Sequence, residues 1–306
     1  MMGDRRCRTV LTVIAGLGAA AAIAGCGGSS SNSGGTSSHS GGGPAAKLKR
    51  AAYVSANASG YKVAIALHET VKAPASGSTP LTVAATGTGS FSPGQHQGAF
   101  TMNMTIPTSS GPQSLQLQMV LDHATVYVRM PPELASKLPG GKPWVYVRYS
   151  QLGRAAGIPE LGSLLNSGES INDPGQYLDY LRVTAGGSIQ DLGQETVNGV
   201  STTHYHALVD LAKLPDAVPA SGRRAAEQLV ALLQRGGAST TEMPIDVWID
   251  GSNQVRRIHL AYNLTVNGAS AGVDMTENML EYGPQPAPTP PPAGEATNAI
   301  SLLPTG

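Results

Sequence analysis

Apolar and polar residues alternate along most of the chain between residues 61 and 282. Val63, Ile65 and Leu67 open this series with a period of two. The same period recurs in the segments 81–85, 100–106, 115–121, 126–130, 144–149, 189–197, 201–211, 245–250, 255–266 and 273–282. Alternation over four to eight residues, bounded by Gly, Pro, Ser or Asn, is typical of strands with one buried face. The pattern therefore predicts eleven strands.

The links between the first six predicted strands are short. Asp122-His123 leaves room only for a tight hairpin, and Asn198-Gly199 and Asp250-Gly251 are turn pairs later in the chain. Parallel neighbours would need crossovers of a dozen or more residues. We therefore expect the first six strands to form an antiparallel meander.

Four stretches have a helical pattern instead. Residues 44–59 are rich in Ala, and residues 221–234 have an apolar stripe of Ala225, Leu229, Leu232 and Leu233. Residues 149–166 fit two short helices divided at Pro159, and Asp173-Pro174 begins a further one. A sheet with one apolar face must be covered on that face. The predicted fold is α+β, a large curved antiparallel half-barrel of about eleven strands over a few short helices that enclose an apolar cavity.

The N-terminus has the order of a secretory signal. Arg5, Arg6 and Arg8 precede an apolar stretch of residues 10–22, and Ile23-Ala24-Gly25-Cys26 forms a lipobox. The apolar stretch is shorter than the roughly 20 residues that span a bilayer. We predict a lipoprotein signal peptide over residues 1–25, with Cys26 as the lipidated first residue of the mature chain. An uncleaved anchor with a chance cysteine is the alternative.

The remaining chain divides by composition. Residues 26–45 are dominated by Gly and Ser and are expected to be a flexible tether. Residues 46–283 hold the predicted elements and are expected to form one domain. Residues 284–306 are rich in Pro and are expected to be a disordered tail. The lipid anchor would place the domain on the extracytoplasmic face of the cell membrane.

Composition and motifs exclude several kinds of function. The chain has 20 Lys and Arg against 20 Asp and Glu, so it lacks the basic excess of a nucleic-acid-binding protein. Its two cysteines lie in the signal and at the lipidation site, which leaves no thiol for a disulfide or a metal in the mature domain. The fingerprints of the common hydrolase, nucleotide and zinc-protease sites are absent from the sequence. No cofactor and no enzymatic activity are predicted.

Two constellations remain to be interpreted. His204 and His206 share one strand face, but the sequence offers no third metal ligand at motif spacing, so a polar outer face is the preferred interpretation and no metal is predicted. Asp246 and Asp250 flank Trp248 on one strand face. Paired carboxylates can perform acid–base chemistry, yet alternation in a sheet with one polar face also explains them.

Methionine and leucine provide candidates for ligand contacts. Met102, Met104 and Met119 fall on the apolar phase of predicted strands, and Leu164 and Leu165 fall in a predicted helix over the sheet. Flexible thioethers adapt to irregular apolar shapes and would suit a cavity that accepts acyl chains. Ordinary core filling is the competing interpretation for each methionine.

Several segments together resemble a known group of proteins. They are the lipobox, Val126-Tyr127-Val128-Arg129-Met130-Pro131, Lys142-Pro143-Trp144-Val145, Thr202-Thr203-His204-Tyr205, Ile245-Asp246-Val247-Trp248-Ile249-Asp250 and Asn253-Gln254-Val255-Arg256-Arg257. In this order they resemble actinobacterial LolA-like lipoproteins, related to the LppX/LprG lipid carriers. The resemblance covers about residues 53–282. It implies an eleven-strand half-barrel whose cavity receives acyl chains, and it implies no catalytic residues.

Two functions follow from these observations. The first is a non-enzymatic carrier of lipid or glycolipid in the cell envelope. The second is a surface interaction protein or sensor partner with a solid core and no small-molecule ligand. The expected partners are the membrane, through the lipid anchor, and a lipid or glycolipid ligand, without nucleic acid.

Overall fold

The computed structural model describes residues 43–73, 79–108, 111–151, 189–217, 220–235, 242–266 and 268–302. The predicted signal peptide, Cys26 and most of the tether lie outside these residues. So do the helices predicted between residues 152 and 188, with Leu164 and Leu165.

All eleven predicted strands are present, and one more is added near the C-terminus. The strands are β1 (Tyr61–Lys72), β2 (Leu81–Ser92), β3 (Gln97–Thr108), β4 (Gly111–Asp122), β5 (Thr125–Arg129), β6 (Trp144–Arg148), β7 (Gln190–Val197), β8 (Val200–Asp210), β9 (Glu242–Asp250), β10 (Val255–Val266), β11 (Ala269–Tyr282) and β12 (Ala296–Asn298). They form a single sheet of 12 strands. The prediction of one large, mainly antiparallel sheet with a few short helices is confirmed.

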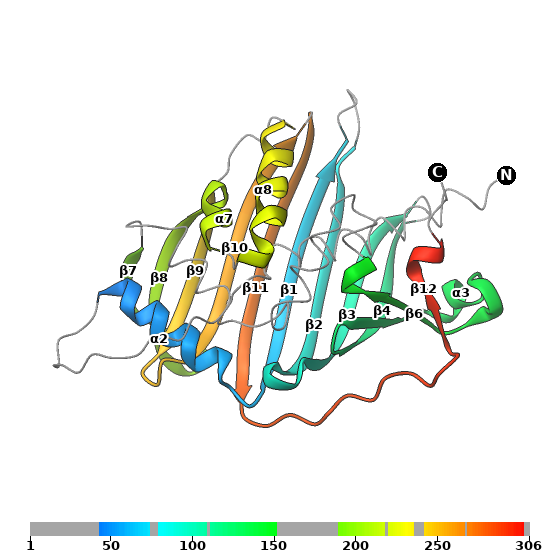
Figure 1. The fold of residues 1–306 in the computed structure, drawn as a ribbon, viewed down its shortest axis with the longest axis horizontal. Coiled ribbons are helices and arrows are strands. Elements are labelled where there is room, and N and C mark those ends of the chain that lie inside the picture. The colour runs from blue at the N-terminus through cyan, green and yellow to red at the C-terminus, as the bar shows by residue number, and fades with distance from the viewer. Residues whose placement is uncertain are drawn as a thin grey trace.

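The sheet consists of two meanders joined at their ends. Its order is β12-β6-β5-β4-β3-β2-β1-β11-β10-β9-β8-β7, so the predicted meander of the first six strands is confirmed. The second meander runs from β7 to β11. The two are joined because β1, in the first meander, pairs antiparallel with β11, the last strand of the second (Figure 1). Most of the sheet therefore follows the order of the chain, and one long-range pairing completes it.

Left-handed residues close two of the hairpins. Asn198 and Gly199 lie between β7 and β8 with φ angles of 50° and 81°, as a type I′ turn requires. The predicted Asp122-His123 turn is displaced by one residue, because Asp122 still pairs in β4 and His123 and Ala124 make the turn. His123 takes up the positive φ of 52°.

Four α-helices accompany the sheet in the described residues: α2 (Pro44–Ala56), α3 (Pro132–Ala135), α7 (Leu214–Ala217) and α8 (Ala220–Arg235). Helices α2 and α8 confirm the helices predicted over 44–59 and 221–234. The buried side chains described for α8 are Ala226 and Val230. The predicted stripe of Ala225, Leu229, Leu232 and Leu233 lies outside the side chains that the structure describes.

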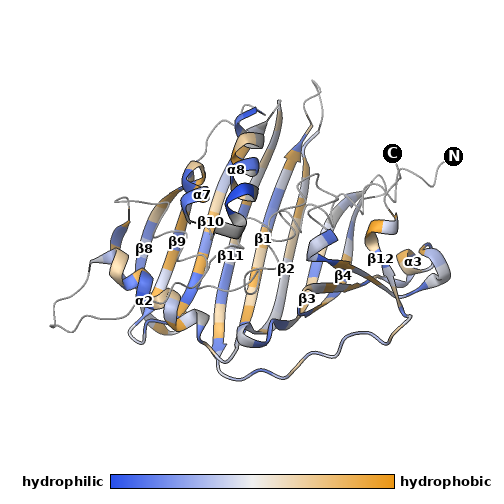
Figure 2. Ribbon diagram, in the orientation of Figure 1, coloured by the Kyte–Doolittle hydropathy of each residue, from blue (hydrophilic) through white to orange (hydrophobic). Residues whose placement is uncertain are grey.

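The core lies on one face of the sheet. On β1, for example, Val63 and Leu67 are buried while Lys62 and His68 are exposed. Figure 2 shows the same alternation of apolar and polar residues along the central strands. This face of the sheet, with the buried side chains of the cluster that contains Val63 and Leu67, is called the apolar face below.

One end of the apolar face is covered by α2. This helix crosses the sheet at the end where β1 begins (Figure 1), and its residues Leu48, Ala51 and Ala52 belong to the buried core. At the same end the ring of Tyr61 lies 5.8 Å from that of Phe91 and 6.1 Å from that of Tyr282, measured between centroids. Aromatic side chains and a helix therefore close this end.

Part of the C-terminal segment pairs with the sheet, contrary to the sequence-based expectation. Strand β12 pairs in parallel with β6, and Thr297 within it is only 9% exposed. Ala299 and Leu302, in the following 3-10 turn, pack against the core. The prediction of a disordered tail is wrong for residues 296–302, because the edge strand β6 offers unpaired backbone groups that a passing chain can satisfy.

Candidate functional site

The apolar face is rich in methionine. Met102, Met104, Met130, Met243 and Met279 are buried in it, and Met119 and Met275 pack against it. The chain has nine methionines, of which two are Met1 and Met2. Every methionine beyond residue 2 therefore belongs to one apolar cluster.

The register of the strands explains how the predicted methionines meet. Met102 lies opposite Leu117, and Met119 lies opposite Phe100, across the β3–β4 pair. Met104 continues the same face of β3 and is 1% exposed. The predicted strand phase of these three methionines is confirmed, whereas their role as ligand contacts stays a prediction. Met243 lies before the predicted strand segment 245–250, so the alternation of that segment could not place it.

The two phenylalanines of the chain lie on glycines of neighbouring strands. A Cβ atom on Gly89 would stand 2.3 Å from Cδ2 of Phe100, and one on Gly98 would stand 2.3 Å from Cδ1 of Phe91. Gly87 is covered by Phe100 in the same way. Aromatic rings thus take the place of the side chains that β2 and β3 lack.

A carboxylate lies within the apolar face. Glu277 on β11 is 1% exposed and stands in register between Ile65 of β1 and Ile258 of β10. Met275 and Met279 flank it along β11. Glu277 was not predicted from the sequence, although its position on the apolar phase of β11 was a visible signal.

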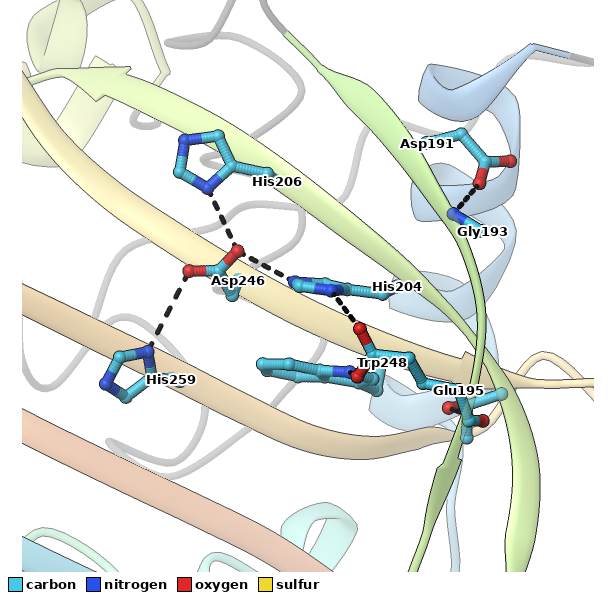
Figure 3. A network of polar contacts seen from close by, with 9 residues as sticks. Asp191, Gly193, Glu195, His204, His206, Asp246, Trp248 and His259 are labelled. Atoms are coloured by element: carbon cyan, nitrogen blue, oxygen red, sulfur yellow. Dashed lines mark hydrogen bonds and ion pairs between the residues drawn. The ribbon is translucent and has the colours of Figure 1, made fainter.

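A polar cluster occupies the opposite face of the sheet (Figure 3). Asp246 on β9 is at its centre: its Oδ1 atom lies 2.8 Å from Nε2 of His204 and 2.9 Å from Nδ1 of His206, both on β8. Its Oδ2 atom lies 3.8 Å from Nδ1 of His259 on β10. The structure therefore joins His204 and His206 to Asp246 and His259, a grouping that was not predicted from the sequence.

A second carboxylate extends the polar cluster to the edge strand β7. Glu195 lies 2.9 Å from Nδ1 of His204 through Oε1, and its Oε2 accepts a hydrogen bond of 2.7 Å from Nε1 of Trp248. The ring of His204 stacks on Trp248 with a centroid separation of 4.1 Å. Both ring nitrogens of His204 thus face carboxylate oxygens. These contacts tie β7, β8 and β9 together through their side chains.

The polar cluster shifts the acidity of its carboxyl groups. Burial acts to raise the pKa of Asp246, but the hydrogen bonds and charges of His206 and His204 outweigh it, so that the pKa lies below its usual value. The pKa of Glu195 is also lowered, first by the hydrogen bond from Trp248 and then by His204. Both carboxyl groups are therefore held in the charged form.

Asp250, which flanks Trp248 together with Asp246, is not part of the polar cluster. Asp250 makes its own contacts, with the backbone N–H groups of Ser252 and Gln254 and with Nε of Arg256. Within the described ranges, no group of three or more His, Cys, Asp or Glu side chains has the arrangement of a metal site. The imidazoles and carboxylates of the cluster contact one another, which is the arrangement of a stabilising network.

The first prediction concerns the pH dependence of this network. Because the pKa of Asp246 is lowered in the folded state, its contribution to stability is present above the unfolded pKa of about 3.9 and is lost as the pH falls through the lower folded value. We expect Asp246→Asn to lower the free energy of unfolding by about 1.5–3 kcal/mol at pH 6, as hydrogen bonds to a charged group do. Urea unfolding at pH 6 and pH 3 measures this. Equal losses at both values would contradict it.

No family model matches this chain. A sequence match is an uncharacterized 31.2 kDa protein from the rplA-rplJ intergenic region of Streptomyces griseus, which is 30% identical over 151 residues. The alignment covers 49% of this chain and 46% of that protein, so it spans about half of each.

Three solved structures are similar to this chain over most of its length. LprF from Mycobacterium bovis matches with a TM-score of 0.40 and 15% identity, over 82% of this chain and 97% of that one. The lipoprotein LppX of Mycobacterium tuberculosis matches with a TM-score of 0.35 and 13% identity, over 79% and 96%. A LolA superfamily protein from Nitrosomonas europaea has a TM-score of 0.24 and 8% identity, over 77% and 93%. An LppX protein and a LolA superfamily protein, the kinds of protein that the sequence resembles, are thus among the solved structures to which this chain is similar.

Proposed function

We propose that this chain is a lipid-anchored protein of the extracytoplasmic face of the cell membrane, and that its apolar face binds the acyl chains of a lipid or glycolipid. The gathering of all methionines beyond Met2 in one apolar cluster carries this proposal. Methionine is unbranched and has three rotatable bonds, so a surface that it lines can repack around chains of varied shape. We further propose that the protein acts by binding alone, without catalysis.

The identity of the bound molecule is tested on protein from its native membrane. Native mass spectrometry should find a lipid bound at near one-to-one stoichiometry. A protein that carries no lipid and purifies with a stable protein partner would favour the interaction module with a solid core.

The anchor is proposed from the lipobox. In the described residues no helix combines the length and the apolar character that a membrane crossing requires. We expect Cys26→Ala to remove the protein from the detergent phase in a partition assay, because the mature chain then lacks its acyl groups. The control is Cys7→Ala, which changes only the predicted signal peptide and should leave partitioning unchanged. Detergent-phase recovery of a Cys26→Ala protein free of its signal would contradict the anchor.

The binding face is tested by filling it. Met119→Trp should abolish co-purification of lipid while the melting temperature changes little, because the larger side chain occupies space that the acyl chain would take. The control on the same strand is Gln118→Trp, since Gln118 points to the other face, where its Oε1 accepts a hydrogen bond of 3.3 Å from Arg129. In a solid core the Met119→Trp change would instead cost about 1–3 kcal/mol through overpacking. That cost, with no lipid ever found, would overturn the proposal.

A further inference from the structure

The two ends of the apolar face differ in chemistry. At the end where β1 begins, the tilted rings of Tyr61, Phe91 and Tyr282 pack together at the end of the sheet that α2 covers. Eight residues further along β1 the same face carries Glu69. At about 3.3 Å per residue the two ends lie roughly 26 Å apart along the strand. An acyl chain of one bilayer leaflet needs about half of a 30 Å hydrocarbon layer, so it fits between them.

Glu69 lies on the apolar face by register. It pairs with Val83 of β2 on one side and with Val273 of β11 on the other, and both valines are buried. Val273 in turn pairs with Tyr262 of β10, which packs against the core. A carboxyl group and a phenol thus stand on one face, separated by a single strand, at the end away from α2.

The electrostatics of the two groups agree with this placement. Burial raises the pKa of Glu69. Burial also raises the pKa of Tyr262, and the charge of Glu69 raises it further. Each group is therefore partly withdrawn from water, and the two are close enough to interact electrostatically. A partly buried polar group is stabilised when a bound apolar molecule supplies it with a hydrogen-bond partner.

From this juxtaposition we infer that Glu69 and Tyr262 form the polar end of the lipid site, and that they select a neutral headgroup bearing hydroxyl groups. This inference rests on the proposed function. A hydroxyl donates a hydrogen bond to the carboxyl of Glu69 and exchanges one with the phenol of Tyr262. A carboxylate or phosphate headgroup would meet the Glu69 charge and be repelled. The acyl chain then extends from this end over Leu67 and Met275 toward α2.

Two probes with the same acyl chain separate headgroup selection from chain binding. 1-Monopalmitoylglycerol carries two free hydroxyls, and methyl palmitate carries none. Titration of the delipidated full-length mature protein, followed by native mass spectrometry, gives the dissociation constant of each. We expect the wild-type protein to bind monopalmitoylglycerol about tenfold more tightly than methyl palmitate, as one hydrogen bond to a carboxyl group supplies.

The variants assign the preference to residues. Glu69→Leu and Tyr262→Phe should each bring the two dissociation constants close to equality while leaving that of methyl palmitate unchanged. Glu69→Gln keeps a hydrogen-bond acceptor and should retain part of the preference. This variant still tests the role of Glu69 if the leucine variant does not fold. The control is Asp274→Asn, next to Val273 on the opposite face, where Asp274 is 59% exposed and lies 3.2 Å from His259; it should retain the full preference.

The outcomes distinguish this inference from the function on which it rests. If the wild-type protein binds neither probe, the lipid-binding function itself fails. If it binds both equally, or if Glu69→Leu and Tyr262→Phe keep the tenfold preference, lipid binding stands and the assignment of the polar end is wrong.

Discussion

Replacing Asp250 by alanine is expected to lower the free energy of unfolding by about 3–5 kcal/mol, the cost of removing one partner of a buried ion pair. The Asp250 side chain is 6% exposed and lies 2.7 Å from Nε of Arg256, whose own side chain is 19% exposed. Its Oδ1 atom accepts hydrogen bonds of 2.8 and 2.9 Å from the N–H groups of Ser252 and Gln254. The change therefore leaves a cation and two turn amides without their acceptor.

Two further variants separate the charge from the turn. Asp250→Asn keeps an oxygen for the two amides and loses the charge, so its cost should be intermediate. Asp191→Ala is the comparison. Asp191 also accepts a hydrogen bond from the backbone N–H two residues later, that of Gly193 at 2.9 Å, but its side chain is exposed. Its cost should stay below about 1 kcal/mol, since an exposed hydrogen bond contributes little. Chemical denaturation measures all three, and equal costs for Asp250→Ala and Asp191→Ala would contradict the account.

Gly89→Ala is expected to cost about 1–3 kcal/mol through overpacking, although alanine is the better residue in an ordinary strand. The added Cβ would stand 2.3 Å from Cδ2 of Phe100 and 2.7 Å from the carbonyl oxygen of Ala99. The Phe100 ring must move, and it is packed in the core between β2 and β4. Thermal or denaturant unfolding gives the loss.

The matched control is Gly94→Ala in the β2–β3 connection. A Cβ there would meet nothing within 4 Å, so this variant should be neutral or slightly more stable. In a Phe100→Leu background the cost of Gly89→Ala should fall, because the ring that blocks the Cβ is gone; a double-mutant cycle measures this coupling. A cost that is unchanged by Phe100→Leu would show that the ring is not the cause.

The sequence determined the strands, because the alternation that marks them is local. Each of the eleven predicted segments became a strand, and Asn198-Gly199 closed its hairpin with positive φ at both positions, as that pair of residues favours. The phase of Met102, Met104 and Met119 was likewise readable, since one buried face fixes which side chains point inward.

The polar cluster was only partly predictable. The shared face of His204 and His206 follows from their spacing of two, but the partner that joins them is Asp246, which pairs with His206 across β8–β9 and with His259 across β9–β10. The pairing of Asp246 with His259 cannot be obtained by counting residues outward from the Asp250-Gly251 turn. A bulge between Val255 and Arg257 shifts the register of that hairpin by one residue.

The tertiary structure alone decided what joins the two meanders and where the C-terminal segment goes. The pairing of β1 with β11 connects residues about two hundred positions apart. Neither the alternation nor the turns of these strands indicate that the two are partners. Composition predicted disorder for the Pro-rich tail, yet Ala296–Asn298 pair with β6. Local patterns specify which face of a strand is buried, whereas the choice of neighbour depends on which backbone edges remain open once the rest of the sheet has formed.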